Sequence, residues 1–179
     1  MKTRVVVTPV AQLETECLVV LALDESANGN SKAAPKVQTA DAAVLAAVRE
    51  VVEAGEISGR MLETALIHRP QGLQAKRLLL IGGGKTANFT SYELRRAAGA
   101  AVRLLKAKSL RSFALLLPPL AGGAPEAAKA AVEGAFVGNF DPDTYKSDRK
   151  DQRIDEYLSE VGLEVRLERK HGMFLGITG

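Results

Sequence analysis

A short apolar run that ends in three glycines constrains the fold of this chain more than any other feature. Leu78 to Ile81 are all large aliphatic residues, and Gly82, Gly83 and Gly84 follow without a break. Such a run is typical of a strand that is covered on both faces, as in the parallel sheets of α/β proteins. The sequence therefore predicts a central strand over 77–81 that leads into a glycine loop.

The patterns on either side of this strand predict the rest of an α/β domain. Further strands are expected at 4–10, 18–23, 64–68, 112–117 and 163–167. Helical spacing predicts helices over 41–54, from 91 onward, over 125–137 with Gly138 as the stop, and in a short stretch before 160. The first two strands are too close in sequence for a helical crossover, so we expect them to pair antiparallel at one end of the sheet. The fold class is α/β, with a mixed central sheet flanked by helices.

Composition narrows the class of protein. A chain of 179 residues with 46% hydrophobic residues and a net charge of +3 suits a soluble globular domain. The single cysteine, Cys17, excludes an intramolecular disulfide, and its apolar neighbours predict a buried, unreactive thiol. The sequence shows neither a signal-peptide pattern nor an apolar run of about 18 residues. We therefore expect a cytoplasmic protein that makes no contact with a membrane.

The glycine run invites a phosphate-binding interpretation, which the neighbouring residues weaken. A Walker loop requires a glycine where Leu79 stands. A dinucleotide fingerprint requires an acidic residue after the next strand, where prolines stand at 118–119. Both motifs also need a helix that begins at the loop, whereas a capping box of Thr90 and Glu93 delays the helix to Ser91. The glycines are therefore expected to form a tight turn with positive φ angles.

Residues that could carry catalysis are scattered along the chain. His68 and His171 are far apart in sequence, and neither a cysteine nor a histidine cluster could bind zinc. Four acidic residues gather in one polar stretch: Asp141, Asp143, Asp148 and Asp151. Their spacing, interrupted by a proline and by basic residues, does not fit a calcium loop and indicates a salt-bridged surface. The sequence predicts no catalytic residue, no cofactor site and no metal site in this chain.

The helix region 95–111 is basic throughout. It holds six cationic residues and no acidic residue: Arg95, Arg96, Arg103, Lys106, Lys108 and Arg111. A solvated helix face explains this pattern. Nucleic-acid binding is the alternative, although the cations do not share one narrow face and no aromatic residues are interleaved for base stacking.

Two stretches together resemble the N-terminal domain of the leucyl (cytosol) aminopeptidases. The first is the run 77–85 with the helix around 94–99, and the second is 133–140 followed by Tyr145-Lys146-Ser147. The resemblance implies a macro-domain-like three-layer sandwich over 1–150. Residues 151–179 would then lead to the linker of a catalytic domain. That domain would use two divalent metals, zinc or manganese, to hydrolyse the peptide bond, and none of its signature residues occurs in this chain.

The resemblance also implies a function. We expect a non-catalytic accessory domain that helps to assemble a homo-oligomer and shapes access to the active site. Its partners would be its own catalytic domain and other subunits, and the parent enzyme would release N-terminal amino acids from peptides. Two alternatives stay open. A macro-like fold could bind an ADP-ribose-like ligand through the amides of Gly82, Gly83 and Gly84, and the helix 95–111 could bind nucleic acid.

Overall fold

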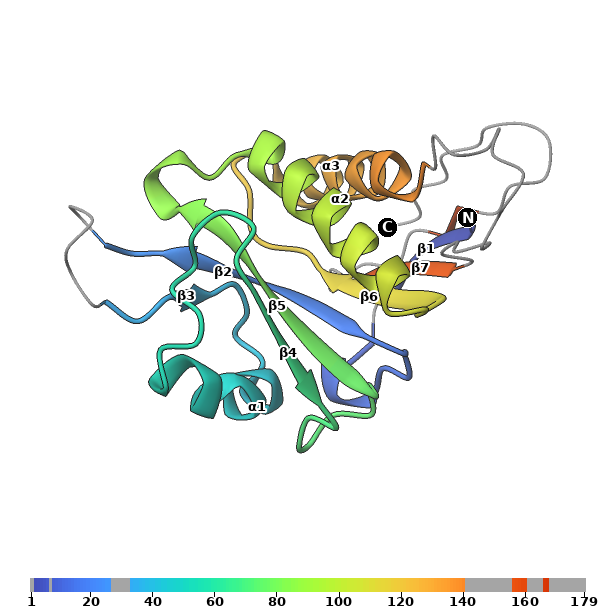
Figure 1. Ribbon diagram of the computed structural model, residues 1–179. Helices are drawn as coiled ribbons and strands as arrows, with labels where there is room; N and C mark the ends of the chain where they lie inside the picture. The colour runs from blue at the N-terminus through green and yellow to red at the C-terminus, as the bar shows by residue number, and fades with distance from the viewer. Residues whose placement is uncertain (1, 7, 27–32, 141–155, 161–165, 168–179) are drawn as a thin grey trace.

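A mixed β-sheet forms the middle layer of the computed structural model, which describes residues 2–6, 8–26, 33–140, 156–160 and 166–167 (Figure 1). The strands are β1 Lys2–Val6, β2 Leu18–Asp24, β3 Lys36–Val37, β4 Thr64–His68, β5 Arg77–Lys85, β6 Ser112–Leu116, β7 Glu156–Glu160 and β8 Arg166–Leu167. Their order in the sheet is β4-β5-β2-β6-β7-β1-β8, and β3 pairs with β2. The five strands from β5 to β1 run parallel, whereas β3, β4 and β8 are antiparallel to their neighbours.

Helices cover both faces of the sheet, as the continuous apolar strands predict. Helix α1 (Ala42–Glu53) packs on one face, and α2 (Ser91–Ala107) and α3 (Gly123–Asn139) lie side by side on the other (Figure 1). Alternate residues of β2 and β5 pack in two separate hydrophobic cores, because successive side chains of a strand point to opposite faces. Leu18, Val20 and Leu80 belong to the core under α1, while Val19 and Leu79 belong to the core under α2 and α3.

The start of α2 confirms the strongest local prediction. Thr90 accepts a hydrogen bond from the Tyr92 amide, and Glu93 reaches back to the Thr90 amide, which completes the capping box. The stripe that was expected to face the core is buried in full: Leu94, Ala97, Ala98, Ala101, Val102 and Leu105. The neighbouring 3-10 turn, η2 (Thr86–Asn88), separates β5 from this helix.

The prediction that β1 and β2 pair antiparallel is wrong. Strands β6 and β7 lie between them, and β1 pairs parallel with β7 and antiparallel with β8. The reason is burial, because six consecutive residues of β2 are buried and need neighbours on both sides and both faces. The connection, which includes the 3-10 turn η1 (Val10–Gln12), crosses to the centre of the sheet and is held there by bonds from the Gln74 and Lys76 amides.

Other elements also differ from the prediction. The strand expected over 4–10 is β1, Lys2–Val6, and Val10 lies in the 3-10 turn η1. The expected short helix before residue 160 is instead strand β7, since pairing with β6 and β1 outweighs local preference. Helix α3 begins at Gly123 and continues through Gly138, which was expected to stop it. Of the strand expected at 163–167, residues 166–167 form β8, and the rest lies outside the described residues.

Candidate functional site

The carboxyl end of β5 is the first candidate site, because ligands of open α/β sheets bind outside the carboxyl ends of parallel strands. Gly82, Gly83 and Gly84 lie there, but they extend β5 and do not form the expected turn. Only Gly84 has a positive φ, of +85°. A Cβ on Gly82 would collide with the backbone carbonyl oxygen of Arg60, so glycine is required at this position for close approach of the backbone.

Two amides of the glycine run, those of Gly82 and Gly84, donate hydrogen bonds to the loop 59–63. The Gly82 N–H donates to the Glu63 carbonyl at 2.7 Å, and the Gly84 N–H donates to the Gly59 carbonyl at 3.0 Å. The Leu62 N–H in turn donates to the Gly82 carbonyl at 2.9 Å. The loop 59–63 therefore lies against the end of β5. Its carbonyl groups accept the hydrogen bonds that these amides would otherwise donate to a phosphate.

A carboxylate that the sequence analysis missed holds this loop in place. Glu63 Oε2 accepts hydrogen bonds from the Ser58 amide at 2.8 Å, the Ser58 hydroxyl at 2.8 Å and the Arg60 amide at 3.3 Å. Burial raises the pKa of Glu63, but the bonds from Ser58 and Arg60 outweigh it and leave the pKa below its ordinary value. The convergent amides thus bind an anion that belongs to the chain itself.

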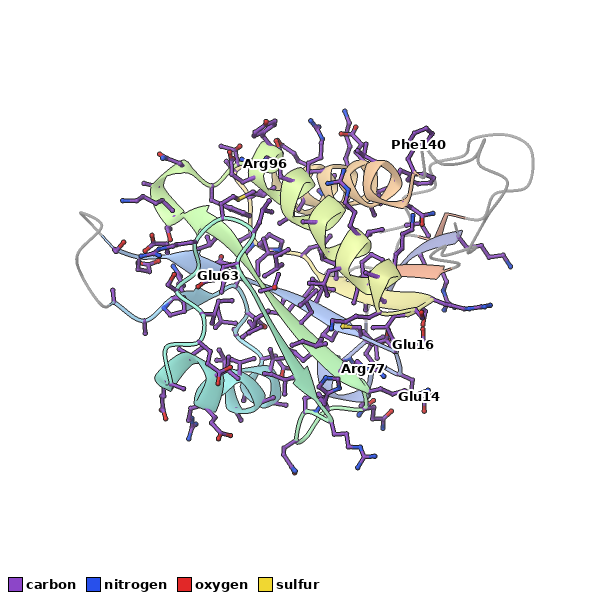
Figure 2. The ribbon with its side chains drawn as sticks, in the orientation of Figure 1. Glu14, Glu16, Glu63, Arg77, Arg96 and Phe140 are labelled. Carbon is purple, nitrogen blue, oxygen red and sulfur yellow. The ribbon has the colours of Figure 1, made fainter. Side chains whose placement is uncertain are left out.

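A second missed carboxylate, Glu16, acts at the opposite end of the sheet (Figure 2). Its Oε2 accepts from the Arg111 amide at 2.7 Å and the Ser112 amide at 2.9 Å, where β6 begins. Burial raises the pKa of Glu16, but the bonds from the Arg111 and Ser112 amides and the Ser112 hydroxyl, together with the charge of Lys76, leave the pKa below its ordinary value. Neither carboxylate has a sequence pattern that marks it, since each bonds to a loop whose path depends on tertiary contacts.

Replacing Glu63 by glutamine is expected to reduce stability by about 1 kcal/mol at pH 7, because the amide accepts weaker hydrogen bonds than the carboxylate. The folded-state pKa lies below the unfolded value, so this stability is present above about pH 4.3 and is lost as the pH falls through the folded pKa. Urea unfolding of the parent and of Glu63→Gln gives the free energy of unfolding of each. The difference between the two should be smaller at pH 3 than at pH 7. Glu56→Gln, at an exposed loop position, is the control and should change little. An equal loss of unfolding free energy for Glu63→Gln at both pH values would contradict the stabilising role of the Glu63 carboxylate.

The basic residues of α2 are largely engaged by the chain itself. Arg95 forms an ion pair with Glu133 of α3. The Arg96 guanidinium lies over the Tyr92 ring, 5.8 Å from its centroid, and Lys106 Nζ donates to the Asn139 carbonyl at 3.2 Å. Two of these contacts join α2 to α3. The basic stretch thus has a structural explanation, which weakens the nucleic-acid alternative.

Glycines bring α2 and α3 into backbone contact. A Cβ on Gly99 would lie 3.0 Å from the Gly134 carbonyl oxygen, and a Cβ on Gly138 would collide with the Gly99 carbonyl. Small residues spaced four apart allow this approach. The stretch 133–140, which carries half of the resemblance described above, is therefore the α3 side of a close helix pair.

An exposed apolar patch lies at the end of α3. Phe136, Val137 and Phe140 are 45%, 61% and 73% exposed, and Figure 2 shows Phe140 beyond the end of the helix layer. This patch was not predicted from the sequence. The sequence contains a pattern that indicates it. The small residues of α3 mark the buried face of the helix, so these three large residues fall on the outer side. Grouped large apolar side chains on a surface are typical of an interaction site.

The described residues offer few groups for catalysis. Among them, no set of three or more His, Cys, Asp or Glu side chains could hold a metal ion. His68 is exposed on β4. Cys17 is fully buried, as expected, and burial raises its pKa to about 12. His171 and the acidic group from Asp141 to Asp151 lie outside the described residues. No helix in the described part of the chain is long and apolar enough to cross a membrane.

Comparison with known proteins places these features in a family. Residues 19–149 match the model of the cytosol aminopeptidase family, N-terminal domain. The chain is 49% identical over 162 residues to a probable cytosol aminopeptidase of Acidobacterium capsulatum, with 86% of this chain and 32% of that protein covered. The chain spans about a third of the length of the curated relatives it matches.

Solved structures give the same fold. A tomato leucine aminopeptidase mutant matches with a TM-score of 0.66 and 18% identity, over 90% of this chain and 32% of that one. The macrodomain of Thermus aquaticus DarG matches with a TM-score of 0.54 and 13% identity, over 89% of this chain and 97% of that one. The expected macro-domain-like sandwich is confirmed by these two matches.

Proposed function

The chain belongs to the cytosol aminopeptidase family, in which it is an N-terminal domain, and from this premise we propose that it acts as a non-catalytic accessory domain. The observation that carries the proposal is the family match over residues 19–149, in a chain that spans about a third of its relatives. The parent enzyme would release N-terminal amino acids from peptides in the cytoplasm. Two divalent metals, zinc or manganese, would be held by a separate catalytic domain.

The proposed division of labour assigns residues 1–150 to the macro-like domain and 151–179 to the segment that leads toward the linker. The patch of Phe136, Val137 and Phe140 supports a docking role, because its apolar side chains are exposed immediately before the polar stretch that follows α3. Covering it would remove apolar surface from water, which favours association. We propose that the catalytic domain or another subunit covers this patch, and that the contact helps assembly and shapes access to the active site.

The ADP-ribose-like alternative at Gly82, Gly83 and Gly84 rests on the likeness of the fold to a macrodomain. Against it, the amides of Gly82 and Gly84 donate to the carbonyls of Glu63 and Gly59. A phosphate could take these amides only if the loop 59–63 moved away. The accessory role needs no such rearrangement and is the function we favour.

A chimaera tests the accessory role. In it, this chain replaces the matching third of the Acidobacterium capsulatum relative, and the product is assayed with a leucyl chromogenic substrate and Mn²⁺. We expect the chimaera to assemble and to hydrolyse the substrate, and the isolated chain to show no turnover above buffer. Replacing Phe136, Val137 and Phe140 by serine should impair assembly of the chimaera by at least about tenfold, since interface energy concentrates in buried aromatic residues.

The matched control is Leu45→Ser on α1, which is 40% exposed on the opposite face and should leave assembly unchanged. Metal-dependent turnover by the isolated chain that survives extensive purification would refute the non-catalytic assignment. Full assembly of the triple serine variant would refute the docking role of the patch.

A further inference from the structure

Strand β4 is an edge of the sheet without the usual protection. Among the described residues it pairs with β5 on one side and with nothing on the other (Figure 1). Natural edge strands are guarded by charged residues, prolines or bulges against pairing with another chain. Thr64–His68 contains no proline and no lysine, arginine, aspartate or glutamate, and its pairing with β5 is regular over the whole strand.

The hydrogen bonds at both ends of β4 show which residues face outward. The Gly82 amide donates to the Glu63 carbonyl, and the Arg69 amide donates to the Lys76 carbonyl, so odd-numbered residues bond toward β5. In an antiparallel pair, residues alternate between those that bond to the neighbour and those that do not. The backbone groups of Thr64, Leu66 and His68 therefore point away from the sheet, each with one donor and one acceptor.

We propose that two copies of this chain join their sheets through antiparallel pairing of β4, about a twofold axis at Leu66. In this register Leu66 faces the partner's Leu66, and Thr64 faces the partner's His68. All three outward-facing residues then meet outward-facing residues, so every free donor and acceptor on this edge finds a partner. A register shifted by one residue would place outward groups against inward ones and would lose these bonds.

The side chains fit the same register. Thr64 and His68 are exposed, and across the axis they form hydroxyl–imidazole pairs that can share a hydrogen bond. Leu66 packs against the core under α2 and α3 and would meet the partner's Leu66 beside that core. Beyond the ends of the strand, the same register places Glu63 across from the partner's Arg69, where the φ of 54° at Arg69 turns the chain out of the strand. The bonds of Glu63 to Ser58 and Arg60 all end on Oε2.

The inference deepens the proposed assembly role by naming a surface, yet it depends on the edge strand alone. It does not involve the patch of Phe136, Val137 and Phe140. The two ideas can therefore fail separately, because each is tested with variants on a different element of the isolated chain or of the chimaera.

Two double variants of the 179-residue chain test the pairing. Thr64→Lys with His68→Lys places like charges directly across the axis in two symmetric pairs, and should weaken self-association at least about tenfold. Thr64→Lys with His68→Glu places opposite charges across the same axis, and should restore association to at least the parent level. Both positions are exposed, so thermal unfolding of the dilute variants should match that of the parent.

Sedimentation equilibrium up to about millimolar chain gives the association state, and amide hydrogen exchange gives the register. We expect the amides of Thr64, Leu66 and His68 to gain protection as concentration rises, while those of Ala65 and Ile67 are protected at every concentration. A parent chain that stays monomeric would overturn the proposal. Association that survives the double lysine variant would also overturn it, and so would failure of the lysine–glutamate variant to associate.

Discussion

Replacing Gly134 by alanine is expected to destabilise the fold by about 2–3 kcal/mol, the upper part of the range that overpacking of a well-packed interior costs. Alanine is the better helix former by about 1 kcal/mol, so propensity alone predicts the opposite sign. The difference arises from the close contact of α2 and α3. A Cβ on Gly134 would collide with the backbone carbonyl oxygen of Arg95 and would approach the Ala98 Cβ to 3.0 Å.

The contact cannot relax by a side-chain rotation, because the atom that the new methyl group meets belongs to the main chain of α2. The helices must instead move apart, and the buried alanines between them then lose packing. Gly134→Leu should be more damaging than Gly134→Ala for the same reason. Lys129→Ala, at an exposed position of the same helix, is the control and should change stability by less than about 0.5 kcal/mol.

Urea unfolding followed by circular dichroism measures these differences. If Gly134→Ala proved as stable as the parent or more so, the close helix pair would be wrong, and the glycine would need another explanation. The same outcome would leave the α3 part of the family resemblance without a physical reason.

Features that depend on neighbouring residues could be predicted from the sequence. The capping box of Thr90 and Glu93 set the start of α2, and the spacing of Leu94, Val102 and Leu105 set its buried face. The run Leu78–Ile81 predicted a strand covered on both faces, because only apolar residues occupy a fully buried strand. In each case the interaction that decides the structure lies within a few residues of the pattern.

Features that depend on distant segments could not be predicted in this way. The place of β1 beside β7 and β8 is set by pairings with residues more than 150 positions away. β7 itself was expected to be helical, because its five residues reveal nothing of the gap between β6 and β1 that they fill. Long-range pairing of this kind regularly overrides local preference.

The roles of Gly138 and Gly82 also depend on distant segments and could not be predicted from the sequence. Gly138 was expected to end a helix and Gly82 to form a turn, since glycine is common where φ must be positive. Neither has a positive φ, and both are glycine because another backbone lies against them. A sequence shows that a glycine is present, but the reason for it depends on what packs there.

The second large effect is expected at Gly82, where alanine should cost at least about 2–3 kcal/mol. The new Cβ would collide with the Arg60 carbonyl oxygen and push the loop 59–63 away from β5. That movement would also break the bonds of the Gly82 and Gly84 amides to the loop. Stability and local order should therefore fall together.

Two other glycines, Gly83 and Gly55, provide controls. A Cβ on Gly83 would meet side chains, lying 2.6 Å from Leu23 Cδ2 and 2.9 Å from Phe89 Cε2. Gly83→Ala should therefore be partly rescued by Phe89→Leu, whereas no side-chain change should rescue Gly82→Ala. Gly55 has a positive φ and nothing within 4 Å of its Cβ position, so Gly55→Ala should cost only the backbone strain of about 1–2 kcal/mol.

Chemical denaturation ranks the glycine variants by their free energy of unfolding. Hydrogen exchange of the Gly82 and Gly84 amides shows whether the loop 59–63 has moved. We expect both amides to lose protection in Gly82→Ala and to keep it in Gly55→Ala. Unprotected Gly82 and Gly84 amides in the parent, together with parent-like stability of Gly82→Ala, would mean that the loop does not lie on the glycine run. The amides of that run would then be open to a phosphate. This result would favour the ADP-ribose-like alternative over the accessory role.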